Sequence, residues 1–102
     1  MTIDDLKREL ADALRAEEKA TDRLRSAEYA LATFEEEVEA LKAEAQDPEW
    51  SECATDKLDR LRAEVEEVER AAEGARRRRR EIEEELDAVD RTAVHRVHTG
   101  RW

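Results

Sequence analysis

Five consecutive arginines, at positions 76–80, are the residues of this chain with the clearest chemical potential. Guanidinium groups bind phosphate through paired hydrogen bonds, so an arginine run can contact nucleic acid. In a helix, however, successive residues point about 100° apart, so the run wraps the helix and forms no basic face. Glutamates flank it on both sides, and the net charge of −10 repels phosphate at long range. We interpret the run as a solvated, self-paired helix segment; an acidic protein partner and nucleic acid are the disfavoured alternatives.

Two histidines and one cysteine are the candidate metal ligands. His95 and His98 have the three-residue spacing that zinc ligands use on a helix, but only Asp90 offers a nearby third ligand, and arginines surround them. Cys53 is the only cysteine, which excludes an internal disulfide and a cysteine-based zinc site. Histidines near a helix end also suit the helix dipole. We therefore expect a plain helix end, an inert Cys53 and no metal or cofactor.

No arrangement of residues suggests catalysis. The sequence has no serine/histidine or cysteine/histidine pattern and no glycine-rich phosphate loop. Its many carboxylates fall on faces that we expect to be exposed, where no pocket shifts their pKa values. A two-helix structure also does not readily form a concave site. We expect a non-enzymatic protein without a small-molecule substrate.

Composition restricts the elements that can position these residues. The chain has 102 residues, of which 47% are charged, with two glycines and one proline. Few residues are therefore available for turns, and this composition is typical of long helices or coiled coils. Disorder is the competing interpretation of so polar a chain. No basic, apolar start resembles a secretory signal, and no apolar stretch approaches the roughly 20 residues of a membrane span. We expect a cytoplasmic protein without membrane contact.

Apolar residues recur at alternating spacings of three and four, which is the heptad pattern of coiled-coil a and d positions. The pattern makes a folded helical structure the better interpretation. The first run is Ile3, Leu6, Leu10, Ala13, Ala20, Leu24, Ala27, Leu31, Phe34, Val38, Leu41 and Ala45, with Glu17 as its one interruption. The second run is Ala54, Leu58, Leu61, Val65, Val68, Ala72, Ala75, Ile82, Leu86, Val89 and Ala93, with Arg79 as its one interruption.

A single break separates the two runs. Asp47 can cap a helix, and Pro48 fits the first position of a helix. We predict one domain over 1–102. Its segments are a helix over about 3–45, a turn over about 46–51, a helix over about 52–97 and a short basic tail over 98–102. The fold class is all-α: two long helices form an antiparallel coiled-coil hairpin that packs into a larger helical bundle. An extended parallel dimer is the alternative.

The register of the hairpin follows from pairing a residues with d residues. In an antiparallel pair of helices, the numbers of two facing residues add up to the same constant along the whole hairpin. We predict a constant of 99, in which Phe34 faces Val65, because a constant lower by seven leaves almost no turn. Glu17 and Arg79 then fall in adjacent layers on opposite helices. Each interrupts a heptad alone, but together they can form a charge-assisted pair that fixes the register.

Small residues widen the apolar stripe beside a thin part of the core, and we predict that they form an interface with further helices. Helix propensity alone is the alternative reason for the alanines. Trp102 is a second candidate anchor, because tryptophan is enriched at interface hot spots; it otherwise covers the open end of the hairpin. The predicted interface residues are Leu14, Ala16, Ala20, Ala27, Ala30, Ala71, Ala72 and Trp102.

The sequence favours a structural, assembly or adaptor protein that acts through helix–helix interactions, with itself or with another helical protein. The alternative is a small acidic regulator or inhibitor that binds a basic surface of a protein partner. Direct nucleic-acid binding through the arginine run is the third interpretation. At the turn, we expect Trp50 to cover the last core layer near Leu41, or otherwise to contact a partner.

Overall fold

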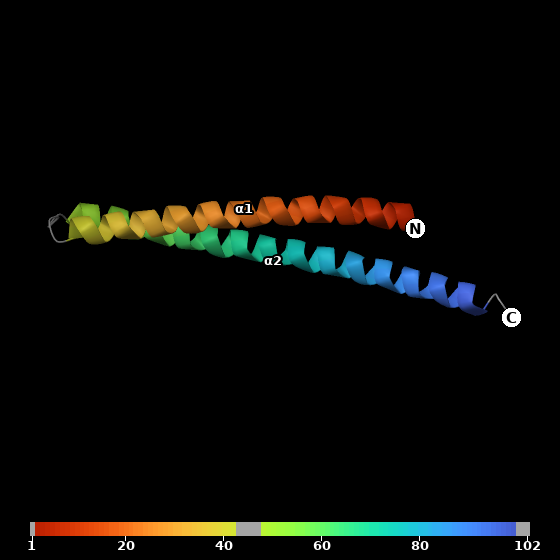
Figure 1. Ribbon diagram of the computed structural model, residues 1–102. Coiled ribbons are helices and arrows are strands. Elements are labelled where there is room, and N and C mark those ends of the chain that lie inside the picture. The colour runs from red at the N-terminus through yellow and green to blue at the C-terminus, as the bar shows by residue number, and fades with distance from the viewer. Residues whose placement is uncertain (1, 43–47, 100–102) are drawn as a thin grey trace. The chain divides into compact units, whose positions relative to one another are not determined.

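In the computed structural model of the protein, two long helices pack against each other, which confirms the predicted all-α hairpin (Figure 1). Helix α1 is Ile3–Lys42 and helix α2 is Pro48–Thr99. The structure describes residues 2–42 and 48–99, with side chains as far as Arg91. No strand occurs in these ranges.

The helix boundaries differ from the prediction at α2. This helix begins at Pro48, four residues before the predicted start, so 48–51 belong to the helix and not to the turn. Proline suits the first helical position because its missing N–H has no helical partner there, and Glu49 places a carboxylate at the positive end of the helix dipole. At its other end α2 reaches Thr99, two residues beyond the prediction. The rest of the predicted tail, with Trp102, lies outside the described residues.

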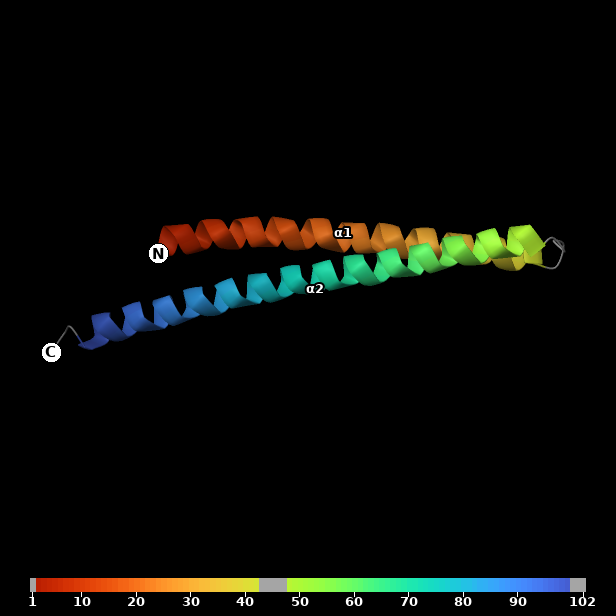
Figure 2. The same cartoon turned by 180° about the vertical axis from the view of Figure 1, so that it is seen from behind.

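The chain divides into two compact units, and each contains a part of both helices. The hairpin unit, residues 20–72, joins the second half of α1 to the first part of α2. The end unit combines residues 1–19 with residues 73–102. Within each unit the two helix segments run antiparallel, side by side in both views (Figures 1 and 2).

Burial follows the predicted heptads closely. Every predicted a or d residue with a described side chain is buried or half-buried, except Ile3 and Leu41. The core is nevertheless thin: of the six residues buried in the described part of the chain, four are alanines and only one is a large side chain with almost no exposure. The buried residues are Leu6, Ala13, Ala27, Ala54, Ala72 and Ile82.

Contacts in the hairpin unit show that the predicted register is wrong by one heptad. The Lys57 ammonium lies 4.3 Å from the centroid of the Phe34 ring, and the two residue numbers sum to 91. The nearest heptad register has a sum of 92, in which Phe34 faces Leu58. At a sum of 99, Phe34 would face Val65, which is eight residues, or about 12 Å along the helix, away from Lys57. The sum of 92 also explains why Ala54 is buried, because it then faces Val38.

The end unit follows the same register. Arg78 and Glu9 approach to 3.5 Å, although a sum of 99 would place Asp90 opposite Glu9. That register would separate Arg78 from Glu9 by twelve residues, about 18 Å, which exceeds the reach of the two side chains. The prediction failed because it placed the turn too late in the chain. The midpoint of the predicted turn 46–51 is 48.5, whereas the midpoint between the observed helix ends at Lys42 and Pro48 is 45, so the sum falls by seven.

A capping box, formed by Thr2 and Asp5, begins α1. The Asp5 N–H donates a hydrogen bond of 3.2 Å to the Thr2 hydroxyl, while the Thr2 N–H donates one of 3.3 Å to the Asp5 carboxylate. These bonds satisfy backbone donors that have no helical partner. The hydrogen bonds from Thr2 lower the pKa of Asp5 below its ordinary value. A threonine followed three residues later by an acidic residue is the signal that predicts this cap.

Acid should loosen the first turn of α1. The pKa of Asp5 is lower in the folded chain than in the unfolded chain. The stability that the Asp5 carboxylate contributes is therefore present above about pH 4 and is lost as the pH falls through the lowered pKa. We expect faster amide hydrogen exchange in the first turn at low pH, with little change in the middle of α1. Thr2→Ala should cause the same local fraying at neutral pH, at a cost of about 1 kcal/mol. Unchanged exchange in Thr2→Ala would contradict the cap.

Gly74 lies inside α2, where glycine is a poor helix former. A methyl group added at its Cα would meet nothing within 4 Å, and its φ is not positive. We expect Gly74→Ala to stabilise the fold by about 0.5–1 kcal/mol, because alanine loses less backbone entropy on folding. Urea unfolding followed by circular dichroism measures the change. The reverse substitution at an exposed position of the same helix, Ala71→Gly, should destabilise by a similar amount.

Candidate functional site

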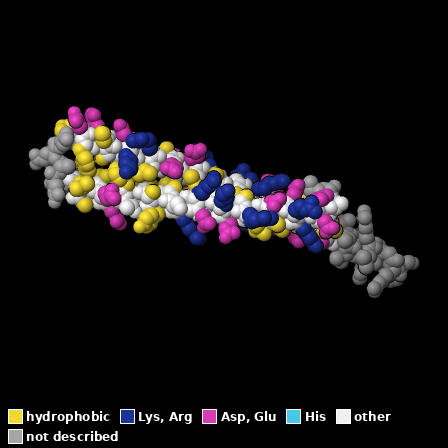
Figure 3. Space-filling model, turned by 90° about the horizontal axis from the view of Figure 1, so that it is seen from above, with side chains coloured by type: hydrophobic (Ala, Val, Ile, Leu, Met, Phe, Trp, Pro, Cys, Tyr) yellow, Lys and Arg dark blue, Asp and Glu magenta, His cyan; other side chains and the backbone are white. Residues whose placement is uncertain are grey.

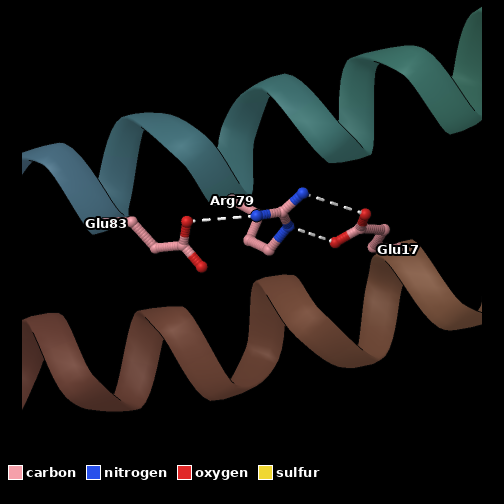
Figure 4. A network of polar contacts seen from close by, with 3 residues as sticks. All are labelled: Glu17, Arg79 and Glu83. Atoms are coloured by element: carbon pink, nitrogen blue, oxygen red, sulfur yellow. Dashed lines mark hydrogen bonds and ion pairs between the residues drawn. The ribbon is translucent and has the colours of Figure 1, made fainter.

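Glu17 on α1 and Arg79 on α2 meet in the end unit, as predicted. Arg79 Nε donates to Glu17 Oε2 at 2.5 Å, and a terminal nitrogen of the guanidinium donates to Glu17 Oε1 at 3.3 Å (Figure 4). The other terminal nitrogen donates to Glu83 Oε2, one turn later on α2, at 3.0 Å. The side chains of Arg79 and Glu17 are only 24% and 19% exposed. This bidentate geometry is the strongest form of the arginine–carboxylate pair.

The hydrogen bonds to Glu17, and secondarily to Glu83, raise the pKa of Arg79 above its ordinary value. Because the pKa of Arg79 is raised in the folded chain, the stability that this cation contributes is fully present below the ordinary pKa and is lost only at a pH above the raised pKa. Arg79 therefore stays charged over the whole range in which proteins are handled. The pair lies inside a heptad seam and does not act as a pH switch on the arginine side.

The arginine run is partly occupied by acidic partners. Arg79 contacts Glu17 and Glu83, and Arg78 lies 3.5 Å from Glu9 on α1. The predicted self-pairing within α2 is thus found for Arg79 and Glu83. The contact of Arg79 with Glu17 on α1 was also predicted. The contact of Arg78 with Glu9 was not predicted, because it depends on the register.

The structure gives the predicted interface residues different degrees of burial. Ala27 and Ala72 are buried inside the hairpin unit, so the prediction that they face a partner is wrong: they fill the hairpin's own core. Ala20 is half-buried. Four residues remain exposed, and Trp102 lies outside the described residues. The exposed residues are Leu14, Ala16, Ala30 and Ala71.

A groove in the end unit, which the sequence had not indicated, lies beside one of these exposed residues. Its volume is about 500 Å³. Leu10 from α1 and Leu86 from α2 provide apolar walls. Leu14 follows Leu10 by one helical turn, so it extends the apolar surface along α1, and it is 46% exposed. The polar residues of the groove are Arg80, Glu83, Glu84, Asp87 and Asp90.

The hairpin unit has a smaller groove of about 260 Å³ near the connection. Trp50 is half-buried and lines it together with Leu41, as predicted, although Leu41 is still 45% exposed. Cys53 is a free, exposed thiol in the same groove. On one face of the molecule, hydrophobic side chains gather next to the connection, while basic and acidic side chains alternate elsewhere (Figure 3).

Metal-binding geometry does not occur among the side chains described as far as Arg91: no group of three or more histidine, cysteine, aspartate or glutamate residues is placed to hold an ion. His95 and His98, which we expected to belong to a plain helix end, have side chains outside the described ones. Within the described helices, no segment combines the length and the apolar character that crossing a membrane requires.

These features define a two-helix hairpin with an ionic pair in its seam and exposed apolar side chains beside a charged groove. Comparison of the chain with protein-family models, with curated proteins and with solved structures gives no match.

Proposed function

We propose that the chain is a non-enzymatic structural, assembly or adaptor protein that acts by packing helices against itself or another helical protein. The observation that carries the proposal is the apolar surface of the end unit, where Leu14 is 46% exposed next to the groove walled by Leu10 and Leu86. Contiguous apolar surface of this kind is typical of interaction sites.

The thin core supports the same proposal. Ile82 is the only large side chain that is almost completely buried within the described part of the chain. Two helices packed mainly through alanine and half-buried leucine and valine leave much apolar area in contact with water. Each square ångström of that area that a further helix covers stabilises the assembly by about 25 cal/mol. This apolar surface would be buried if the two-helix hairpin packed against further helices in a larger bundle.

Sedimentation equilibrium of the purified chain tests the proposal, in reductant so that Cys53 stays a thiol. We expect a mass of two or more chains, and we expect Leu14→Glu to weaken association by at least about tenfold, because a charge then has to be desolvated at the interface. Tyr29→Glu is the matched control. It removes another exposed large apolar residue, 75% exposed on the hairpin unit, and should leave the mass unchanged. Equal behaviour of the wild type and Leu14→Glu would count against this surface.

The high negative charge favours one alternative function, a small acidic regulator or inhibitor of a protein with a basic surface. The chain has 29 acidic residues against 19 basic ones. Electrostatic capture of this kind weakens steeply as salt screens the charges, whereas apolar helix packing persists. A monomer at every concentration that binds a basic protein only at low salt would favour the regulator over the assembly protein.

A further inference from the structure

In the end unit, α2 continues past the start of α1 (Figures 1 and 2). The capping box of Thr2 and Asp5 fixes that start. In the observed register Ile3 faces Val89, so the helical backbone over 91–99 has no α1 residue opposite it. The helix lengths agree with this overhang of α2, since α1 has 40 residues and α2 has 52.

The sequence of this extension is opposite in charge to the rest of the chain. Residues 91–102 contain three arginines and no acidic residue, whereas residues 1–90 contain 29 acidic and 16 basic residues. We call 91–99, the helical part of this stretch, the basic extension. It also carries Ala93, Val94 and Val97, so a helix over this range has apolar as well as basic residues to offer.

The groove of the end unit has the complementary chemistry. Its four carboxylates, from Glu83, Glu84, Asp87 and Asp90, outnumber the single arginine. Glu83 is already bound to Arg79 and Asp87 lies 3.4 Å from Arg91, but no ion pair among the described residues involves Glu84 or Asp90. The groove therefore presents apolar walls together with carboxylates that have unused hydrogen-bonding capacity.

Resting on the proposed function, we propose that this groove receives the basic extension of a second copy of the chain, and that the exchange is reciprocal. The extension of each copy packs on Leu10 and Leu86 of the other, and its arginines meet the other copy's carboxylates. Both halves of the contact lie on the same chain, so a two-fold axis satisfies them together, which is the usual symmetry of homodimers.

The dimensions agree with such an exchange. The α2 residues of the groove span positions 80–90, about 15 Å at 1.5 Å per residue, and the basic extension spans about 12 Å. Two antiparallel α2 helices that overlap in this way place one copy's extension beside the other copy's groove residues. A second copy is the occupant that the charges favour, because the basic extension carries two arginines and no acidic residue, whereas four carboxylates line the groove.

Two charge-reversed variants of the full chain test the exchange without any assumption about individual ion pairs. One variant reverses the extension, Arg91→Glu with Arg96→Glu. The other reverses the groove, Glu84→Lys with Asp87→Lys. In either variant alone, the extension and the groove carry the same sign of charge. In a mixture of the two, an acidic extension meets a basic groove and a basic extension meets an acidic groove.

Sedimentation equilibrium at moderate salt should show that each variant alone dimerises at least about tenfold more weakly than the wild type, while an equimolar mixture regains the wild-type affinity. Far-UV circular dichroism checks that both variants keep their helices. Glu66→Lys with Glu67→Lys is the matched control: it changes the net charge as the groove variant does, at two exposed residues of the hairpin unit, and should leave dimerisation unchanged.

The outcomes separate this inference from the proposed function. A wild-type dimer that Leu14→Glu weakens, but that both charge variants leave intact, would overturn the exchange and keep helix packing as the function. Two weakened variants that do not rescue each other would also overturn it, since net charge would then explain the loss. A wild type that stays monomeric at every concentration would overturn the exchange, and the proposed function would then require a different helical protein as the partner.

Discussion

Ile82→Ala is expected to destabilise the protein by about 2–4 kcal/mol, the largest effect of a single truncation among the described side chains. Ile82 is 1% exposed and is the one large side chain of the described core with so little exposure. In the observed register it faces Leu10, so alanine would leave a cavity between two helices with few other large residues to fill it. Against a typical total stability of about 5–15 kcal/mol, this loss is a large fraction.

Thermal unfolding followed by circular dichroism should show the midpoint of Ile82→Ala lowered by roughly 10–20 °C. Leu14→Ala is the control, because it removes a similar volume from a side chain that is 46% exposed. It should cost less than about 1 kcal/mol when measured at a concentration at which the chain is monomeric. Similar losses in the two variants would contradict the assignment of Ile82 to the core and of Leu14 to the surface.

The fold could be predicted because burial in a two-helix structure depends on spacing alone. A residue repeated at intervals of three and four returns to the same side of a helix, so apolar residues at these intervals must face a partner helix. Pro48 then determined where the chain could reverse. Ile3 and Leu41 are the exceptions, both exposed by more than a third, and they are the outermost described positions of the α1 heptads.

The register could not be predicted from the same pattern, because a heptad repeat is satisfied equally well after a shift of seven residues. The positions at which α1 ends and α2 begins decided between the sums of 92 and 99, and apolar periodicity carries no information about these positions. Glu17 and Arg79 do not decide it either. They fall in adjacent layers in both registers, so the predicted pair formed although the predicted register did not.

The candidate surface was predicted only in part, for a related reason. Alanine fits both a tightly packed core and an exposed helix face, so its type does not tell which of the two it occupies. Ala72 faces Ala20 in the observed register and is buried, while its neighbour Ala71 is exposed. Leu14 was identifiable because a large apolar residue at a flanking position has no place in a two-helix core. The groove beside it depends on the register and had no signal of its own.

Arg79→Ala is expected to lower the unfolding midpoint by several degrees, more than the same change at any other arginine of the run. Removal of Arg79 leaves the Glu17 carboxylate, only 19% exposed, without the two hydrogen bonds that offset its partial desolvation. Arg77→Ala is the matched control, an exposed arginine two positions earlier on the same helix, and should shift the midpoint little. Equal shifts would mean that water replaces the guanidinium at no cost.

Two further variants separate the strength of the pair from its role. Arg79→Lys should recover only part of the loss, because an ammonium cannot donate two parallel hydrogen bonds to one carboxylate. Glu17→Leu combined with Arg79→Leu should be at least as stable as the wild type, since apolar residues in adjacent layers pack without any desolvation of charge. If the double variant is stable but forms larger or mixed assemblies in sedimentation, the pair limits how the helices associate. A double variant that is both less stable and unchanged in mass would instead make the ion pair a net source of stability.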